Sequence, residues 1–213
     1  QLGDGTTTQR NIPTQILASG VSQIAAGTSH SLILKSDGSL HSFGLNDNGQ
    51  LGDGSTTQRN TPTQILASGV SQIAAGDLGH SLILKSDGSL HSFGLNDNGQ
   101  LGDGTTTQRN TPTQILASGV AQIAAGGGHS LILKSDGSLH TFGKNNSGQL
   151  GDGTTTQRNT PTQILASGVA RLSEQPVPFA ETFTVSGGQS TAPYYNFLDS
   201  IGNNPNMTSF TFH

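Results

Sequence analysis

Residues 24–44 read IAAGTSHSLILKSDGSLHSFG, and almost the same stretch recurs twice along the chain. Residues 73–94 read IAAGDLGHSLILKSDGSLHSFG, and residues 123–143 read IAAGGGHSLILKSDGSLHTFG. The copies differ mainly in the two or three residues before the histidine. This pattern indicates one structural unit built three times, with a variable turn set into an otherwise constant framework.

The repeats extend beyond these stretches. The sequence Gln-Leu-Gly-Asp-Gly begins at residues 1, 50, 100 and 149, so the periods are 49, 50 and 49 residues. Three complete units therefore span 1–49, 50–99 and 100–148, and a partial fourth unit spans 149–172. A period of this length is typical of stacked supersecondary units, among them the blades of a propeller.

Each unit holds four short apolar runs, which in the first unit are residues 14–18, 21–27, 30–35 and 39–44. Asp37-Gly38 between the last two favours a tight hairpin turn. Leu32, Ile33 and Leu34 place apolar side chains on both faces, which predicts a sheet covered by neighbours on both sides. We expect an all-β propeller arc of four-stranded antiparallel blades, three complete and a fourth begun. A β-solenoid is the main alternative, but its coils repeat at shorter intervals.

Composition narrows the function classes. The chain has 213 residues, 31% apolar and 10% charged, with 30 glycines and a formal net charge of −4. There is no basic stripe, so binding to nucleic acid phosphates or to anionic lipids lacks its main electrostatic term. The absence of cysteine excludes disulfides and thiolate catalysis, and no apolar run approaches the length of a membrane span. We expect no nucleic-acid partner and no membrane insertion.

The last part of the chain, residues 173–213, differs in composition. It holds five of the eight phenylalanines and both tyrosines, and it has no basic residue. We interpret it as a linker and the truncated start of a second β-domain, with residues 1–172 forming the propeller repeats. A blade-sealing extension is the alternative.

Residues 21–54, VSQIAAGTSHSLILKSDGSLHSFGLNDNGQLGDG, resemble the regulator of chromosome condensation repeat, in tandem copies of the bacterial type. The resemblance rests on the Ala-Ala-Gly-x-x-His-Ser core, the Asp-Gly turn, the aromatic-Gly pair and Asn-x-x-Gly-Gln-Leu-Gly. It implies four-stranded blades in a propeller of about seven. His41 and Phe43 stand where that family usually has Tyr and Trp.

Three histidines at equivalent places, His30, His80 and His129, suggest a metal site. A propeller separates equivalent residues by a whole blade, so we predict no metal site and a structural role in which the imidazoles bond loop carbonyls near the hub. Ser31, His30 and Asp37 supply the residue types of a hydrolase triad. Neighbours in a strand point to opposite faces, so we predict no catalytic site and no cofactor.

The loop after each aromatic-Gly pair resembles a calcium-binding loop, with Asn46, Asp47, Asn48 and Asp53 as oxygen donors. It lacks the final acidic residue of the EF-hand pattern, and Asx turns explain the same residues, so we favour the turns. An arginine also recurs in every copy, at Arg10, Arg59, Arg109 and Arg158. We expect it to donate hydrogen bonds to loop carbonyls or to a nearby aspartate.

The sequence thus favours a non-enzymatic scaffold that binds a protein partner, in an exported or surface bacterial protein located outside the cell or on its surface. The resemblance supplies two precedents, an exchange factor for a small GTPase and protein inhibitors of β-lactamase. An exchange-factor-like regulator and a docking module of a larger enzyme are the alternatives. Because recognition residues accumulate on loops of rigid scaffolds, the candidate binding residues lie in or beside the variable turn. They are Thr28, Ser29, Asp77, Leu78 and Lys144.

Overall fold

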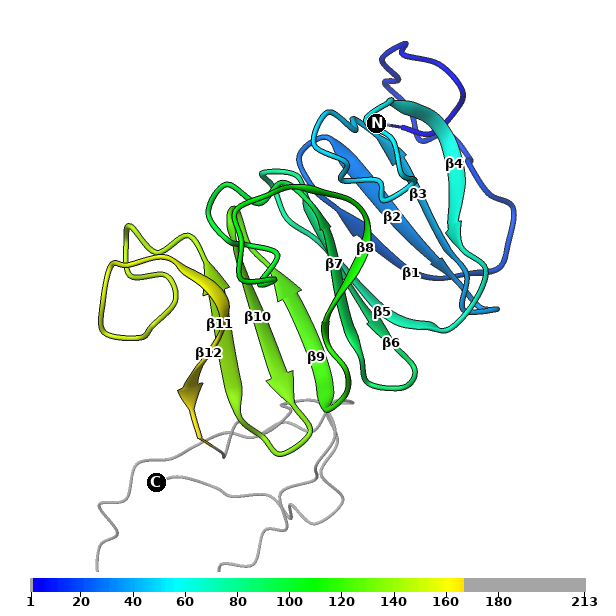
Figure 1. Cartoon of the computed structure of the whole chain (residues 1–213). Helices are drawn as coiled ribbons and strands as arrows, with labels where there is room; N and C mark the ends of the chain where they lie inside the picture. Colours follow the sequence, from blue (N-terminus) through cyan, green and yellow to red (C-terminus); the bar gives the residue numbers. More distant parts are fainter. Residues whose placement is uncertain (1, 167–213) are drawn as a thin grey trace, which may run out of the picture. The chain divides into compact units, whose positions relative to one another are not determined.

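The computed structural model describes residues 2–166, and every regular element in that range is a β-strand. The strands form three separate four-stranded antiparallel sheets that follow one another along the chain (Figure 1). The first sheet consists of β1 (Val21–Ala26), β2 (His30–Lys35), β3 (Leu40–Gly44) and β4 (Arg59–Leu66). The second consists of β5 (Val70–Ala75), β6 (His80–Lys85), β7 (Leu90–Gly94) and β8 (Arg109–Leu116). The third consists of β9 (Val120–Ala125), β10 (His129–Lys134), β11 (Leu139–Gly143) and β12 (Arg158–Leu165).

These sheets are the predicted propeller blades. In each one the strands pair in chain order, as expected for a meander closed by short turns. The innermost strands of neighbouring sheets, β1, β5 and β9, contact one another in sequence, so the small residues at the end of each of these strands lie at the hub. None of the described elements is a helix that could cross a membrane. The expected start of a fourth blade and the expected second β-domain fall outside the described residues.

The strands are grouped differently from the sequence repeats. We expected residues 14–18 to form the first strand of the first blade, but no strand forms there. The equivalent segments β4, β8 and β12 instead close the sheet of the preceding repeat, where Ser42 pairs with Thr63 and Gly44 with Arg59. Each blade is therefore offset from its repeat, and its outer strand comes from the next one. The outer strand tolerates proline because its free edge needs no N–H.

The segment that forms the outer strand in later copies adopts a different structure in the first copy. Residues 10–17 match Arg59–Leu66 at every position except Ile12, yet they form no strand. A strand requires a partner edge, and none of the described strands offers a free edge to residues 10–17. By contrast, Gly3 and Gly5 make the same contacts as their counterparts Gly52 and Gly54 in the second copy. Gly3 packs on Phe43, as Gly52 packs on Phe93. The Gly5 amide donates to the Asn60 carbonyl at 2.9 Å, as the Gly54 amide donates to the Asn110 carbonyl.

The core lies between the blades. Leu32, Leu34 and Leu40 of the first sheet pack against the second sheet, which contributes the buried residues Val70, Ile83 and Phe93. The second and third sheets repeat this interface with the equivalent residues. Alternate residues of β6 face opposite neighbours, which explains why Leu82, Ile83 and Leu84 are all buried. The prediction of sheets covered on both faces is confirmed for the middle blade.

Candidate functional site

In every blade, the turn after the innermost strand and the long loop after the third strand lie at the same end. Because the strands are antiparallel, the turn after β1 and the long loop after β3 leave the sheet at the same end. Hydrogen bonds join them: the Leu45 amide donates to the Ser29 carbonyl and the Lys144 amide to the Gly128 carbonyl, both at 2.8 Å. We call the surface formed by the turns 27–29, 76–79 and 126–128 and the loops 45–58, 95–108 and 144–157 the loop face.

Beneath the loop face, the hub histidines of the first and second blades reach into the next blade. His30 Nε2 lies 3.0 Å from Ser81 Oγ, and His80 Nε2 lies 3.1 Å from Ser130 Oγ. The Ser81 hydroxyl donates to the Gln50 carbonyl at 2.9 Å. Its oxygen must therefore accept from the imidazole, which places the ring proton on Nε2. The histidine role is structural, as predicted, but the direct partner is a serine hydroxyl rather than a loop carbonyl.

These histidines are buried and neutral. Burial lowers the pKa of His30 to about 4. Burial, together with the neighbouring His30 and His129, lowers the pKa of His80 to about 3. His80 Nδ1 has no hydrogen-bond partner among residues 2–166, and a Cβ on Gly76 would collide with the ring atoms Cε1 and Nδ1. A protonated ring would thus hold a second N–H with no acceptor, which the interface cannot accommodate without rearrangement.

The triad residue types separate in space. His30 pairs with Ser81 of the next blade, whereas Asp37 accepts a hydrogen bond from Ser39 Oγ at 2.6 Å on the opposite end of its own blade. The sequence reasoning missed the His30–Ser81 pair because the two residues are 51 positions apart. The recurring His-Ser dipeptide is the signal that reveals it once the blades are stacked. Ser81 is fully buried and its proton is already donated, so the pair is not an activated nucleophile.

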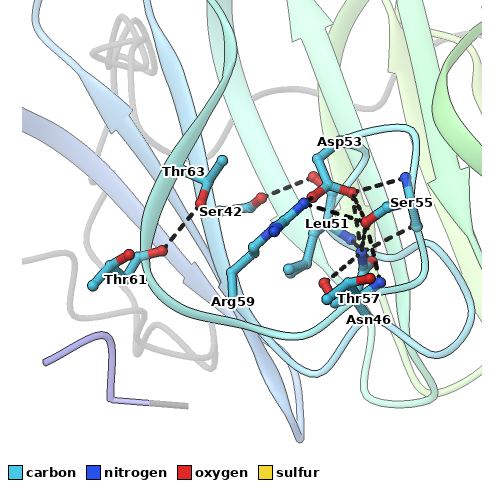
Figure 2. A network of polar contacts seen from close by, with 9 residues as sticks. All are labelled: Ser42, Asn46, Leu51, Asp53, Ser55, Thr57, Arg59, Thr61 and Thr63. Carbon is cyan, nitrogen blue, oxygen red and sulfur yellow. Dashed lines mark hydrogen bonds and ion pairs between the residues drawn. The ribbon is translucent and has the colours of Figure 1, made fainter. Parts of the chain in front are cut away.

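A polar network fixes the long loop after β3 (Figure 2). The fully buried Asn46 donates through Nδ2 to Asp53 Oδ1 at 3.1 Å and to the carbonyls of Ser55 and Thr57 at 3.0 and 3.1 Å. Its Oδ1 accepts from the Leu51 amide at 2.9 Å. Every hydrogen-bonding group of this side chain is therefore used within the loop.

Arg59 completes the network by forming an ion pair with Asp53, in which Nη2 and Oδ2 are 2.6 Å apart. Burial of the Asp53 carboxyl opposes its ionisation, but the hydrogen bonds from Ser55 and Arg59 together hold its pKa below the ordinary value. The expected arginine–aspartate contact is confirmed, and it recurs in every copy: Arg10–Asp4, Arg109–Asp103 and Arg158–Asp152.

This network accounts for two of the four residues that suggested calcium, Asn46 and Asp53. The side-chain oxygens of Asn46 and Asp53 accept hydrogen bonds from loop amides, from a hydroxyl and from the arginine, as the favoured Asx-turn interpretation requires. Within residues 2–166, no group of three or more histidine, aspartate or glutamate side chains is placed to hold a metal ion.

The structure places all five candidate binding residues on the loop face. Thr28 and Asp77 are exposed, Ser29 and Lys144 are half-buried, and Leu78 is 47% exposed. Leu78 and Lys144 come together across the junction of the second and third blades, whereas Thr28 and Ser29 belong to the first blade. Leu78 lies there with Gly127, because its amide donates to the Gly127 carbonyl at 3.1 Å.

The fold and the repeat geometry can be compared with known proteins. A family model for the regulator of chromosome condensation (RCC1) repeat matches residues 1–34, 37–84, 87–133 and 136–177. The chain belongs to the RCC1 repeat family. A second RCC1 repeat model matches residues 21–50, 70–100 and 120–149, each of which begins at the inner strand of a blade. A search of curated proteins finds no match.

Solved structures similar to this RCC1-repeat chain include Prp20p from Saccharomyces cerevisiae, described with its binding properties to Gsp1p and histones. It is 28% identical with a TM-score of 0.61, covering 68% of this chain and 38% of Prp20p. A structure of Kap60 bound to yeast RCC1 (Prp20) matches with a TM-score of 0.60 at 28% identity, covering 68% and 37%. Human WBSCR16 is 30% identical with a TM-score of 0.61, covering 70% and 39%. The chain spans less than two fifths of each of these proteins.

Proposed function

We propose that this RCC1-repeat chain is a non-enzymatic protein-binding module of an exported or surface-displayed bacterial protein, and that it binds its partner through the loop face. The observation that carries this proposal is the distribution of sequence change. The strands, hub glycines and loop networks are repeated almost letter for letter, while the turns before His30, His80 and His129 differ in every copy. A ligand contacts each blade differently, so a binding surface is where copies of one scaffold should diverge.

The chemistry of the residues that recur in every copy supports a binding role over a catalytic one. The buried His–Ser pairs join neighbouring blades, and the Arg–Asp pairs hold the long loops in place. Among the relatives, Prp20p is described with binding to Gsp1p and histones, and yeast RCC1 (Prp20) with bound Kap60. These partners belong to those proteins, and they support the coarser proposal that a propeller of this family binds proteins.

The likeness to Prp20p favours a second candidate, a regulator that acts on a GTPase as an exchange factor. Release of a fluorescent nucleotide from a small GTPase, with and without the chain, distinguishes the two. Accelerated release would replace the scaffold proposal. A docking module of a larger enzyme is the further alternative, and a catalytic domain elsewhere in the same protein would favour it.

Photocrosslinking in the cells that produce the protein tests the binding surface. A benzophenone amino acid replaces either Leu78 on the loop face or Ser86, which is exposed in the hairpin at the opposite end. We expect a discrete protein adduct from position 78 and none from position 86. Equal labelling from both positions, or none from either, would overturn the proposal. Protease treatment of intact cells tests the location: loss of the chain supports surface display, and protection contradicts it.

A further inference from the structure

Three departures from the repeat in the second and third copies converge at one place on the loop face. The second copy inserts a residue and reads Asp77-Leu78-Gly79, and the third reads Gly127-Gly128. The third copy also has Lys144 where the first two have Leu45 and Leu95. These changes are up to 67 positions apart in the sequence, from residue 77 to residue 144.

In the structure they are neighbours. A Cβ placed on Gly128 would stand 3.2 Å from Leu78 Cδ1 and 3.5 Å from both Cβ and Cδ of Lys144. The two side chains therefore flank a segment that has none. A Cβ placed on Gly127 would have no atom within 4 Å, so the space in front of that residue is open. We call Leu78, Gly127, Gly128 and Lys144 the junction patch.

The exposure of Leu78 is unusual in this fold. The other large hydrophobic residues that are exposed are Leu2, Ile12, Val21, Ile24 and Leu165. They belong to the first 24 residues or to the last described strand, where no described blade covers them. Between residues 25 and 164, Leu78 is the one large hydrophobic residue that is exposed. Its exposure thus comes from the inserted turn and not from an uncovered blade face.

The junction patch offers three kinds of group. Leu78 supplies exposed methyl groups, and Lys144 supplies an ammonium that makes no ion pair with any residue in 2–166. The Gly127 amide donates no hydrogen bond to a described residue, while its carbonyl is taken by Leu78. The absence of a side chain at Gly127 allows another main chain to approach closely. An ammonium without an ion pair and an amide without an acceptor can each bind a carboxylate oxygen, and the methyl groups can pack against an aliphatic side chain.

We infer that the junction patch binds an extended acidic segment of a protein partner, in which a glutamate or aspartate adjoins an aliphatic residue. The carboxylate lies between Lys144 and the Gly127 amide, and the aliphatic side chain covers Leu78. This inference rests on the proposed function and adds to it the class of partner segment and the pair of blades that recognises it.

Nuclear magnetic resonance titration with defined peptides tests the inference on the full chain. The probe is the acetylated, amidated pentapeptide Gly-Leu-Glu-Leu-Gly, and the matched peptides replace its Glu with Gln or both Leu with Ser. We expect the Glu peptide to shift the amide signals of residues 77–79, 127, 128 and 144. We expect Lys144→Leu, which restores the residue of the other two copies, to weaken binding about two- to fivefold. Leu78→Ser should weaken it about tenfold. Lys134→Gln, a charge-matched control at the far end of β10, should leave it unchanged.

Added salt should also weaken binding of the Glu peptide, because an exposed ion pair is screened. Equal binding of the Gln and Glu peptides, or shifts confined to other parts of the chain, would overturn the inference. Photocrosslinking separates this failure from failure of the proposed function. An adduct at position 78 without peptide binding refutes the acidic segment alone, whereas absence of an adduct refutes the binding surface itself.

Discussion

His80 and Ser130 lie 50 residues apart in the sequence, yet their side chains meet at 3.1 Å across the junction of two blades. Both residues are fully buried, and the serine hydroxyl donates a hydrogen bond to the Gln100 carbonyl at 2.8 Å. This uncharged hydrogen-bond relay joins β6 of the second blade, β10 of the third blade and the loop after β7, which contains Gln100. His30, Ser81 and Gln50 repeat it one blade earlier.

The relay makes stability dependent on pH. The pKa values of His30 and His80 are lowered in the folded chain to about 4 and about 3, whereas the unfolded value is 6.5. The unfolded state therefore binds protons first, so this stabilisation is complete above pH 6.5 and is lost as the pH falls towards the folded pKa values. Each histidine should remove about 1.4 kcal/mol of unfolding free energy per pH unit. Urea denaturation between pH 6.5 and 5 measures how steeply the free energy of unfolding changes with pH. The His80→Asn variant should lose the contribution of one histidine to this slope. An unchanged slope would contradict the buried neutral relay.

The hub glycine before each histidine is required by close contact. A Cβ on Gly76 would collide with the His80 ring and stand 2.8 Å from the Gly126 carbonyl oxygen. We expect Gly76→Ala to lower the free energy of unfolding by about 1–3 kcal/mol, as overpacking does. Gly127→Ala is the matched control, because a Cβ there meets nothing within 4 Å, and it should change stability by less than about 0.5 kcal/mol. Thermal denaturation compares the two, and similar losses from both would refute the packing argument.

The long loop depends on Asn46, whose fully buried side chain makes five hydrogen bonds with loop groups. Asn46→Ala leaves several buried polar groups without partners, so we expect a loss of about 3 kcal/mol. Asn48→Ala, two residues along the same loop, removes a half-buried side chain outside the network and should cost less than about 0.5 kcal/mol. Millimolar calcium should leave the melting temperature of the unmodified chain unchanged. A rise with calcium would restore the metal-site interpretation.

Stacking of the blades is tested by two isoleucines at equivalent places. Ile73 packs in the interface between the first two blades, whereas Ile24 is 79% exposed. Ile73→Ala should cost about 2–4 kcal/mol, and Ile24→Ala should cost less than about 0.5 kcal/mol. Chemical denaturation of both variants measures the difference. Equal losses would show that Ile24 is covered in solution.

Much of this architecture could be predicted from the sequence, because the information is local and repeated. Leu32, Ile33 and Leu34 in one run indicate a strand buried on both faces, and Asp37-Gly38 indicates the hairpin that follows it. The 49- and 50-residue periods then give the number of blades. Loop carbonyls or a nearby aspartate were the partners expected for the recurring arginine, and the aspartate six positions away is the one it contacts.

Contacts between blades were decided by the tertiary structure alone. The sequence does not reveal that residues 59–66 close the preceding sheet, because a strand takes its place from the edge that is available to it. Residues 10–17 carry nearly the same letters and form no strand, since no such edge is described beside them. The His–Ser relays and the junction patch likewise depend on stacking, which places side chains about 50 or more residues apart within hydrogen-bonding or van der Waals distance. Periodicity fixes the unit, but only packing determines which units meet and which groups they bring together.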